Sequence, residues 1–310
     1  MQILRFAGEN GFQGGSVIAI GFFDGVHIAH RALIERAKKE ARSRSLSLGV
    51  FTFSSESGIK PDAKRIYTTS QRLGLLSDMG VDFAVVCDFA DISDIGKEEF
   101  VRDVLIGKYG ARLVVAGYNF RFGKGAAGSS SDLCKLAAKH GIDALIVPRL
   151  EYKGRAVSSS LVRGYIESTR LTEATELLAT PYFVDGAVEH GLGIGSRRLG
   201  FATLNLPSGV SGIALPHGVY RVAVRLSHGI FSGVANVGVC PTFPGREAHT
   251  EVHIIDFDGD LYGENVRVYF LGYLRSEIKF ESEKELIMQI NIDKKRAINE
   301  NGDVKWIING

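Results

Sequence analysis

The feature that constrains the fold most is a repeated alternation in the first half of the chain. Five almost uninterrupted apolar runs occur there, at residues 16–20, 46–53, 83–89, 113–118 and 144–147. Segments with helical spacing of apolar residues lie between or beside them, at residues 30–44, 70–79, 97–109 and 131–140. Apolar strands that alternate with helices are typical of a parallel sheet covered on both faces. We therefore predict an α/β domain whose ligands bind at the carboxyl ends of its strands.

The pattern changes beyond Pro181, after two short helical patterns at residues 160–168 and 172–179. Apolar residues then alternate with polar or small ones, at residues 220–226, 250–257 and 266–271. Short alternating strands with glycine-containing turns are typical of an antiparallel barrel or sandwich. A final helix is predicted from Ser282, which fits a capping box with Glu285. These shifts predict two domains, residues 1–180 and residues 181–310.

Composition narrows the class of protein and its partners. The net charge of +2 gives no reason to expect a nucleic acid or an anionic membrane as partner. The three cysteines are isolated and odd in number, which argues against a disulfide framework and a cysteine zinc site. The sequence shows no basic-then-apolar leader and no apolar run of about 18 residues, the length of a spanning helix. We expect a cytoplasmic protein with no nucleic acid and no membrane as partner; the oligomeric state is not indicated.

The segment GFFDGVHIAH at residues 21–30 follows the first apolar run and opens a helical pattern. His27 and His30 are three residues apart, so they lie on one helical face. A helix start presents free N–H groups and the positive end of a dipole to an anion. The glycine turn and Asp24 favour a phosphate site over two ordinary histidines. A zinc site is disfavoured, because the chain has no His-Glu-x-x-His sequence.

Two later segments of the first half leave their interpretation open. Residues 123–128 match a dinucleotide fingerprint formally, but they follow a late strand instead of forming the first βα turn. They are either a flexible glycine loop or a loop that contacts a ligand. The serines at residues 158–160 are either helix caps or part of a phosphate cradle, in which Arg163 makes bidentate contacts.

The second half contains a glycine-rich cationic loop at residues 191–200, followed by Thr203 and Asn205. These two residues are two apart, so in a strand both side-chain oxygens point to one side. They are either polar residues of a strand edge or oxygen ligands of a Mg²⁺ ion that also binds phosphates. Glu251, in an apolar strand pattern, is either a general base or a solvent-facing residue.

Taken in order, these segments resemble the bacterial bifunctional riboflavin kinase/FMN adenylyltransferase family, also called FAD synthetases, over nearly the whole chain. Residues 21–30 are similar to the motif G-x-F-D-G-x-H-x-G-H, residues 115–125 to G-x-D-F-x-F-G-K-G, and residues 158–163 to I-S-S-T-x-I-R. Residues 186–205 resemble G-x-V-x-x-G…G-x-x-L-G-F-P-T-A-N of the kinase. Three further kinase segments are matched, at residues 233–243, 251–263 and 272–280. The common order of all these motifs makes the resemblance specific.

The resemblance implies an α/β plus all-β fold. A Rossmann-like nucleotidyltransferase domain would be followed by a six-stranded antiparallel β-barrel kinase domain with a C-terminal helix. It implies phosphorylation of riboflavin to FMN by ATP, and adenylylation of FMN to FAD with release of pyrophosphate. Mg²⁺ with ATP is the implied cofactor, and ATP, riboflavin, FMN and FAD are the implied substrates and products. The alternative is a riboflavin kinase whose first domain binds flavin or nucleotide without turnover.

The resemblance also assigns roles to individual residues. It implies that His27, His30 and Arg163 catalyse adenylyl transfer, and that Glu251 is the base that activates the 5′-hydroxyl of riboflavin. The residues it assigns to ATP are Gly21, Phe23, Asp24, Gly25, Ser159, Ser160, Gly191, Arg197 and Thr203. Those it assigns to the flavin are Asn119, Arg121, Arg275 and Glu277, and those it assigns to the metal are Thr203 and Asn205.

The chain departs from the family pattern mainly in its first half. Ala29 replaces the glycine of H-x-G-H, and residues 54–57 lack the usual Pro-His-Pro. Asn119 replaces an aspartate, and Ala126 stands where an arginine is common. These departures fall on adenylyltransferase motifs, which is why the alternative concerns the first domain alone.

Overall fold

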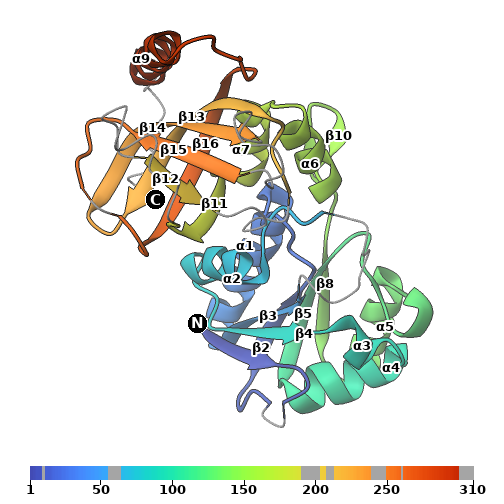
Figure 1. Ribbon diagram of the computed structural model, residues 1–310. Helices are drawn as coiled ribbons and strands as arrows, with labels where there is room; N and C mark the ends of the chain where they lie inside the picture. The colour runs from blue at the N-terminus through green and yellow to red at the C-terminus, as the bar shows by residue number, and fades with distance from the viewer. Residues whose placement is uncertain are drawn as a thin grey trace. The chain divides into compact units, whose positions relative to one another are not determined.

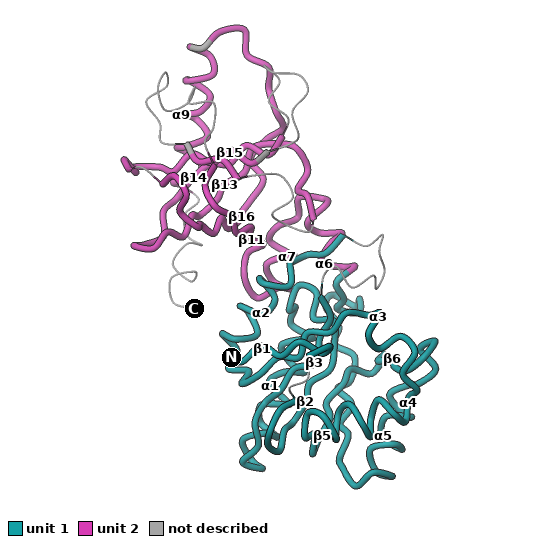
Figure 2. Tube along the Cα trace, turned by 60° about the horizontal axis from the view of Figure 1, so that its bottom comes forward, with its two compact units in different colours: residues 1–159 teal, residues 160–310 magenta. Residues whose placement is uncertain are grey.

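The computed structural model describes residues 1–8, 11–54, 64–189, 203–206, 213–238, 249–259 and 261–299. Contacts divide the chain into two compact units, residues 1–159 and residues 160–310 (Figures 1 and 2). The division falls at the start of helix α6 (Ser159–Glu167), which is followed by α7 (Leu171–Leu178). A functional boundary near residue 180 stays a prediction.

The first unit is built on a six-stranded parallel sheet with the order β1-β4-β3-β2-β5-β8. Its strands are β1 (Gln2–Arg5), β2 (Ser16–Ile20), β3 (Ser47–Phe53), β4 (Phe83–Cys87), β5 (Ala111–Gly117) and β8 (Asp143–Val147). β2 lies in the middle between β3 and β5, as in a doubly wound, Rossmann-like sheet. The predicted α/β fold of the first half is confirmed.

Helices cover both faces of this sheet (Figure 1). α1 (Ile28–Ser43) packs against β2, β3 and β5, and its buried residues include Leu33 and Ile34. On the other face, the π-helix η1 (Phe100–Lys108) and α5 (Ser130–Lys139) share one hydrophobic core with Ile18 of β2. Since both faces of β2 are buried, all five of its residues are inaccessible, which explains its uninterrupted apolar run.

Shorter elements complete the first unit. They are α2 (Thr69–Asp78), α3 (Phe89–Ile92), α4 (Lys97–Glu99), β6 (Arg121–Phe122), the 3₁₀ turn η2 (Lys124–Ala126), β7 (Gly128–Ser129), β9 (Glu151–Tyr152) and β10 (Arg155–Ala156). β6 pairs with β7, and β9 with β10, in two small antiparallel ribbons.

Several predicted bounds need correction. β4 ends at Cys87 instead of residue 89, because Asp88 is the N-cap of the short helix α3. The helix predicted at residues 97–109 begins as α4 and continues as the π-helix η1. Strand β15 ends at Ile254 instead of residue 257, because Asp256 has a φ of +54° in a turn. The sequence pattern misses β1, because three of its four residues are exposed and it has no apolar run.

The second unit contains a six-stranded antiparallel sheet with the order β11-β16-β13-β14-β15-β12. Its strands are β11 (Tyr182–Ala187), β12 (Thr203–Leu206), β13 (Gly218–Leu226), β14 (Gly229–Gly238), β15 (His249–Ile254) and β16 (Asn265–Arg275). An antiparallel bridge between Glu189, just beyond β11, and Asn205 of β12 links the two edges, so the sheet curves into a half-barrel. The predicted six-stranded antiparallel domain is confirmed.

Helices pack on this sheet at two places. α7 packs against β11 and β16, and α9 (Glu283–Asn299) packs against β14. The Ser282 hydroxyl accepts the N–H of Glu285 at 3.3 Å, as a cap should. The Glu285 carboxylate accepts the N–H of Glu281 at 3.2 Å, one residue before the position that a capping box requires. The predicted C-terminal helix and its Ser282 cap are therefore confirmed, whereas Glu285 accepts the N–H of Glu281 in place of that of Ser282.

Within the part of the chain that the structure describes, no helix is both long enough and apolar enough to cross a membrane.

Candidate active sites

The first candidate site lies where β2 ends, in the middle of the parallel sheet. β2 pairs with β3 on one side and β5 on the other, so the strand order reverses here. Open α/β sheets bind ligands at such a switch point, at the carboxyl ends of the strands. Residues 21–27, called the β2–α1 loop below, leave β2 at this point and lead into α1. The predicted phosphate segment thus occupies the position expected of a ligand site.

The β2–α1 loop has an unusual backbone. Phe23 and Val26 have positive φ angles of 56° and 42°. Non-glycine residues rarely adopt this region, and β-branched residues least of all. The N–H of Val26 donates to the carbonyl of Phe23 at 3.0 Å, and Nε of Arg31 donates to the carbonyl of Val26 at 3.1 Å. Backbone strain of this kind persists only where the surroundings hold it, and it is common at ligand sites.

His27 and His30 lie together at the start of α1. Their rings stack with centroids 3.6 Å apart and planes 12° from parallel. The ring of Phe23 packs edge-on against His30, with centroids 5.2 Å apart. His27 is also the N-cap of α1, because its Nδ1 accepts the N–H of His30 at 3.4 Å. The two predicted residues therefore form one stacked pair, in which His27 is buried and His30 half-buried.

Burial keeps this pair neutral. Loss of solvation lowers the pKa of His27 from 6.5 to about 4. It also lowers the pKa of His30 well below its usual value, and the charges of His27 and Arg72 lower it further. Because Nδ1 of His27 accepts a hydrogen bond, we assign the proton of the neutral ring to Nε2. At neutral pH His27 is therefore an uncharged hydrogen-bond donor.

Asp24 and Ser159, two predicted ATP ligands, make structural contacts in the first unit. The buried carboxylate of Asp24 accepts the N–H of Ile66 at 2.8 Å and the N–H of Tyr67 at 3.5 Å. The hydroxyl of Ser159 donates to the carbonyl of Asp24 at 2.9 Å. These bonds hold the β2–α1 loop to the segment before α2 and to Ser159, the last residue of the first unit. A contact of either residue with ATP stays a prediction.

Sequence reasoning missed Arg72, which lies beside the same loop and is 1% exposed. Its Nη1 donates to the Phe22 carbonyl at 2.6 Å and to the Thr52 hydroxyl at 3.1 Å. Its Nη2 donates to the Phe53 carbonyl at 2.7 Å. Arginines in surface helices are mostly exposed, so no signal in the sequence distinguishes this one.

The predicted flavin residues of the first unit follow β5 and are exposed. Asn119 lies two residues beyond β5, and Arg121 begins β6. Nearby, Gly123 has a φ of +74°, and a Cβ there would lie 2.8 Å from the Cα of Lys97. Glycine is therefore required by backbone geometry at this position, whatever the loop binds.

Ser160 and Arg163 lie on α6 in the second unit, where Nη2 of Arg163 donates to the Ser160 hydroxyl at 3.0 Å. Gly191 and Arg197 fall outside the described residues. The parts that these four residues play stay predictions.

The second candidate site lies on one face of the antiparallel sheet. The register places Asn205 of β12 opposite Glu251 of β15, and Glu251 opposite Asn236 of β14. Residues directly opposite in an antiparallel pair share a face and are close neighbours. Thr203 is two positions before Asn205 in β12. The predicted base thus stands beside a predicted metal ligand, and Asn236 is a neighbour that sequence reasoning missed, because only strand register reveals it.

Arg275 and Glu277 follow the same sheet at the end of β16. Nη2 of Arg275 is 2.7 Å from the carboxylate of Asp293, a residue of α9 whose side chain is 2% exposed. The carboxylate of Glu277 lies against Gly238 at the end of β14, and Nδ1 of His217 is 3.8 Å from it. Arg275 therefore anchors α9, and a flavin contact for either residue stays a prediction.

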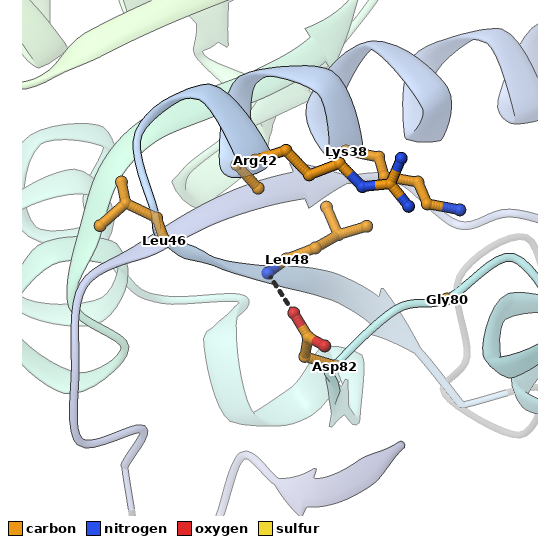
Figure 3. Close-up of a pocket in the computed structure, with 7 residues that line it drawn as sticks. Lys38, Arg42, Leu46, Leu48, Gly80 and Asp82 are labelled. Carbon is orange, nitrogen blue, oxygen red and sulfur yellow. Dashed lines mark hydrogen bonds between the residues drawn. The ribbon is translucent and has the colours of Figure 1, made fainter.

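A separate pocket of about 270 Å³ lies elsewhere in the first unit (Figure 3). Its lining residues are Lys38, Ala41, Arg42, Leu46, Leu48, Gly80 and Asp82. They belong to the end of α1 and to the amino ends of β3 and β4, whereas the β2–α1 loop lies at the carboxyl end of the sheet. None of the predicted site residues lines this pocket.

Comparison with known proteins covers both halves of the chain. A family model described as FAD synthetase matches residues 10–161, and one described as riboflavin kinase matches residues 178–300. A bifunctional riboflavin kinase/FMN adenylyltransferase of Bacillus subtilis (strain 168) is 32% identical over 92% of each chain. The protein of the same name from Escherichia coli (strain K12) is 33% identical, also over 92% of each chain. The chain belongs to the bifunctional riboflavin kinase/FMN adenylyltransferase family.

A solved structure described as a macrolide-efflux protein from Streptococcus pneumoniae is similar to this family member over nearly its whole length. The TM-score is 0.85 and the identity 31%, over 96% of this chain and 99% of that chain. The FAD synthetase match includes His27 and His30, and the riboflavin kinase match includes Asn205 and Glu251. Because both domains are present, the bifunctional interpretation is favoured over a kinase alone.

Proposed function

We propose that this chain converts riboflavin to FMN and FMN to FAD, with ATP as the second substrate of both reactions. The observation that carries the proposal is the stacked, neutral pair of His27 and His30 at a helix start in the FAD synthetase half. The register of Asn205 and Glu251 in the riboflavin kinase half supports the first reaction. A cytoplasmic location is part of this proposal.

In adenylyl transfer, an oxygen of the FMN phosphate attacks the α-phosphorus of ATP. The bond from the α-phosphorus to the bridging oxygen breaks, and pyrophosphate leaves. The FMN phosphate is already an anion at neutral pH, so its attack requires no base. The site must instead stabilise the charge that develops on the α-phosphoryl oxygens and on the leaving pyrophosphate.

The β2–α1 loop and α1 suit this task. Nε2–H of His27 is a donor at neutral pH, and the first turn of α1 has N–H groups free for an anion and no acidic residue. We assign His27 and His30 to the α-phosphate and the leaving group, with Arg163 as an additional cation. We assign to ATP Gly21, Phe23, Asp24, Gly25, Ser159 and Ser160. Asn119 and Arg121 are assigned to FMN.

In the kinase reaction, the carboxylate of Glu251 accepts the proton of the riboflavin 5′-hydroxyl. The hydroxyl oxygen then attacks the γ-phosphorus of ATP, and ADP leaves. The residues assigned to ATP are Gly191, Arg197 and Thr203, and those assigned to riboflavin are Arg275 and Glu277. Asn205 lies directly opposite Glu251 in the strand register, and we assign it with Thr203 to the metal ion that accompanies ATP.

The donor set of the second site suits Mg²⁺ that arrives with ATP. Among the residues that the structure describes, no three histidine, cysteine or acidic side chains gather as a metal site. Thr203 and Asn205 offer two neutral oxygens, and Mg²⁺ commonly completes such a set with water and phosphate oxygens. When bound, the ion would neutralise charge on the phosphates.

The test is a product assay with riboflavin and ATP, read by chromatography. The wild-type chain should form FMN, FAD, ADP and pyrophosphate. The double variant His27→Ala, His30→Ala should lose FAD formation and keep FMN formation, because the altered pair lies in the first unit. His140→Ala is a matched control, since His140 is a first-unit histidine that contacts Glu98 at 3.1 Å. Unchanged FAD formation in the double variant would refute the assignment of the histidine pair.

A kinase with a non-catalytic first domain is the second candidate, favoured by the departures from the family motifs. One of these is compatible with the structure, because Ala29 is the second residue of α1 and does not have a positive φ. The helix therefore accepts its methyl group without backbone strain. A folded wild-type chain that forms only FMN and ADP would establish this second candidate.

A further inference from the structure

Arg72 and Asp24 join the β2–α1 loop to the segment that leads into α2. Asp24 accepts backbone N–H groups from Ile66 and Tyr67, and Arg72 donates to the backbone carbonyl of Phe22. The anion of the loop therefore accepts hydrogen bonds from the segment before α2, and the cation of α2 donates one back to the loop. Both side chains are buried, at 4% exposure for Asp24 and 1% for Arg72.

The carbonyl of Phe22 is the point on which these contacts converge. It accepts from Nη1 of Arg72 at 2.6 Å and from the Thr52 hydroxyl at 3.0 Å. The Arg72 guanidinium also lies 4.8 Å from the centre of the Phe22 ring, within range of a cation–π contact. Nη2 of Arg72 donates to the carbonyl of Phe53 at the end of β3. Arg72 thus fixes the first residues of the loop against the neighbouring strand.

The loop held in this way is the strained one. Phe23, which follows Phe22 directly, and Val26, which precedes His27, both have positive φ. A non-glycine backbone in this region relaxes unless neighbouring contacts hold it. The stack of His27 on His30 depends on where Val26 places the start of α1. The positive charge of Arg72 also lowers the pKa of the His30 ring and so helps to keep that ring neutral.

From this geometry we propose that Arg72 is a positioning residue for adenylyl transfer. It holds the Phe22 carbonyl so that the strained loop presents His27 and His30 to the α-phosphate of ATP. Arg72 acts through the loop and is not assigned a contact with substrate. The inference rests on the proposed function of the histidine pair.

Two variants test this positioning role. Arg72→Gln removes the charge and the guanidinium group that donates from two nitrogens, and Arg72→Lys keeps the charge alone. Lys38→Met is a matched control, because Nζ of Lys38 donates to the carbonyl of Met79 at the other end of α2, at 2.7 Å. Lys38 also lines the pocket of Figure 3, at the opposite end of the sheet from the loop. Each chain is assayed for FAD formation from supplied FMN and for riboflavin phosphorylation.

The kcat of FAD formation should fall about 100-fold in Arg72→Gln, the effect of displacing a catalytic group by about 1 Å. The KM for ATP and the kinase rate should change little, and Lys38→Met should match the wild type. Arg72→Lys should recover only part of the loss, since an ammonium cannot make the same fork of hydrogen bonds. FAD formation at the wild-type rate in Arg72→Gln, or an equal loss in Lys38→Met, would overturn the proposal.

A double-mutant cycle separates positioning from general destabilisation. In the background of His30→Ala, Arg72→Gln should cause a much smaller further loss, because the group that it positions is already gone. Equal losses in both backgrounds would mean that Arg72 acts independently of His30 and would overturn the proposal. If Arg72→Gln does not fold, Thr52→Val replaces it in the same cycle, since it removes the other donor to the Phe22 carbonyl. A wild-type chain that forms no FAD overturns the proposed function together with this role.

Discussion

Acidification is expected to destabilise the first unit through His27. Its pKa is 6.5 in the unfolded chain and about 4 in the folded one. Above pH 6.5 the ring is neutral in both states, so it makes no difference to stability. Between pH 6.5 and pH 4 the unfolded state binds a proton that the folded state does not, so the free energy of unfolding falls as the pH falls. A difference of about 2.5 pKa units at 1.36 kcal/mol each gives a loss of about 3 kcal/mol by pH 4.

The variant that isolates this effect is His27→Asn. Asparagine is among the best N-cap residues, so its side-chain oxygen can replace Nδ1 as acceptor of the His30 N–H. The variant therefore keeps the cap of α1 and removes the titrating group. His30 contributes in the same direction, because its pKa is also lowered. The variant should thus keep part of the pH dependence and lose the share that belongs to His27.

Hydrogen exchange of the amides in β2 and α1, measured against urea concentration at several pH values, gives the free energy of opening of this unit alone. The wild type should lose about 3 kcal/mol more than His27→Asn between pH 6.5 and pH 4. Ring signals of His27 and His30 in an NMR titration provide an independent measurement. Equal pH dependence in the two chains, or a His27 ring that titrates near pH 6.5, would show that burial does not lower the pKa of His27.

Three further changes have outcomes that follow from the structure. Glu251→Gln should lower FMN formation by about 100-fold or more, the usual contribution of a general base. Conversion of supplied FMN to FAD should stay intact, and full kinase activity in this variant would show that Glu251 is not the base. Asp293→Asn breaks the buried ion pair with Arg275 and should lower the stability of α9 packing by about 3 kcal/mol. Hydrogen exchange in α9 should become faster, and unchanged exchange there would contradict the anchoring role of Arg275. Gly49→Ala would place a Cβ 2.2 Å from Cζ of Phe83. The free energy of unfolding of the first unit, measured in urea, should therefore fall by about 1–3 kcal/mol. An unchanged urea midpoint would contradict the close packing.

The sequence predicts the first unit best where burial is complete. β2 agrees with its prediction at both ends, because burial on both faces selects apolar residues for it, and its one polar residue, Ser16, donates its hydroxyl to the carbonyl of Tyr109. Prediction fails where an element is exposed or stabilised from a distance. β1 presents only one buried residue, so it is held by pairing with β4 and not by an apolar pattern of its own. Strand pairing between residues far apart in the chain leaves no local signal.

The same contrast between local patterns and distant contacts applies to the residues of the candidate sites. Spacing alone predicts that His27 and His30 share a helical face, and the structure confirms their proximity. Their neutral state could not be predicted, because it depends on burial by the folded loop. Arg72 and Asn236 were missed for a related reason. The burial of one and the neighbours of the other come from contacts between segments that are distant in sequence.

Under the proposed role of His27 as a phosphate ligand, two demands on one side chain explain a histidine at the start of α1. An aspartate at position 27 would cap the helix well, but its negative charge would repel a phosphate at the same helix end. An asparagine would cap without charge, yet its short amide would not reach as far as an imidazole ring stacked on His30. Histidine caps α1 through Nδ1 and leaves Nε2–H as a donor on the opposite edge of the ring. A residue type that ranks low as a cap therefore suits the proposed double role of His27 as cap and anion ligand. Burial, which keeps the ring neutral, makes the two roles compatible at neutral pH.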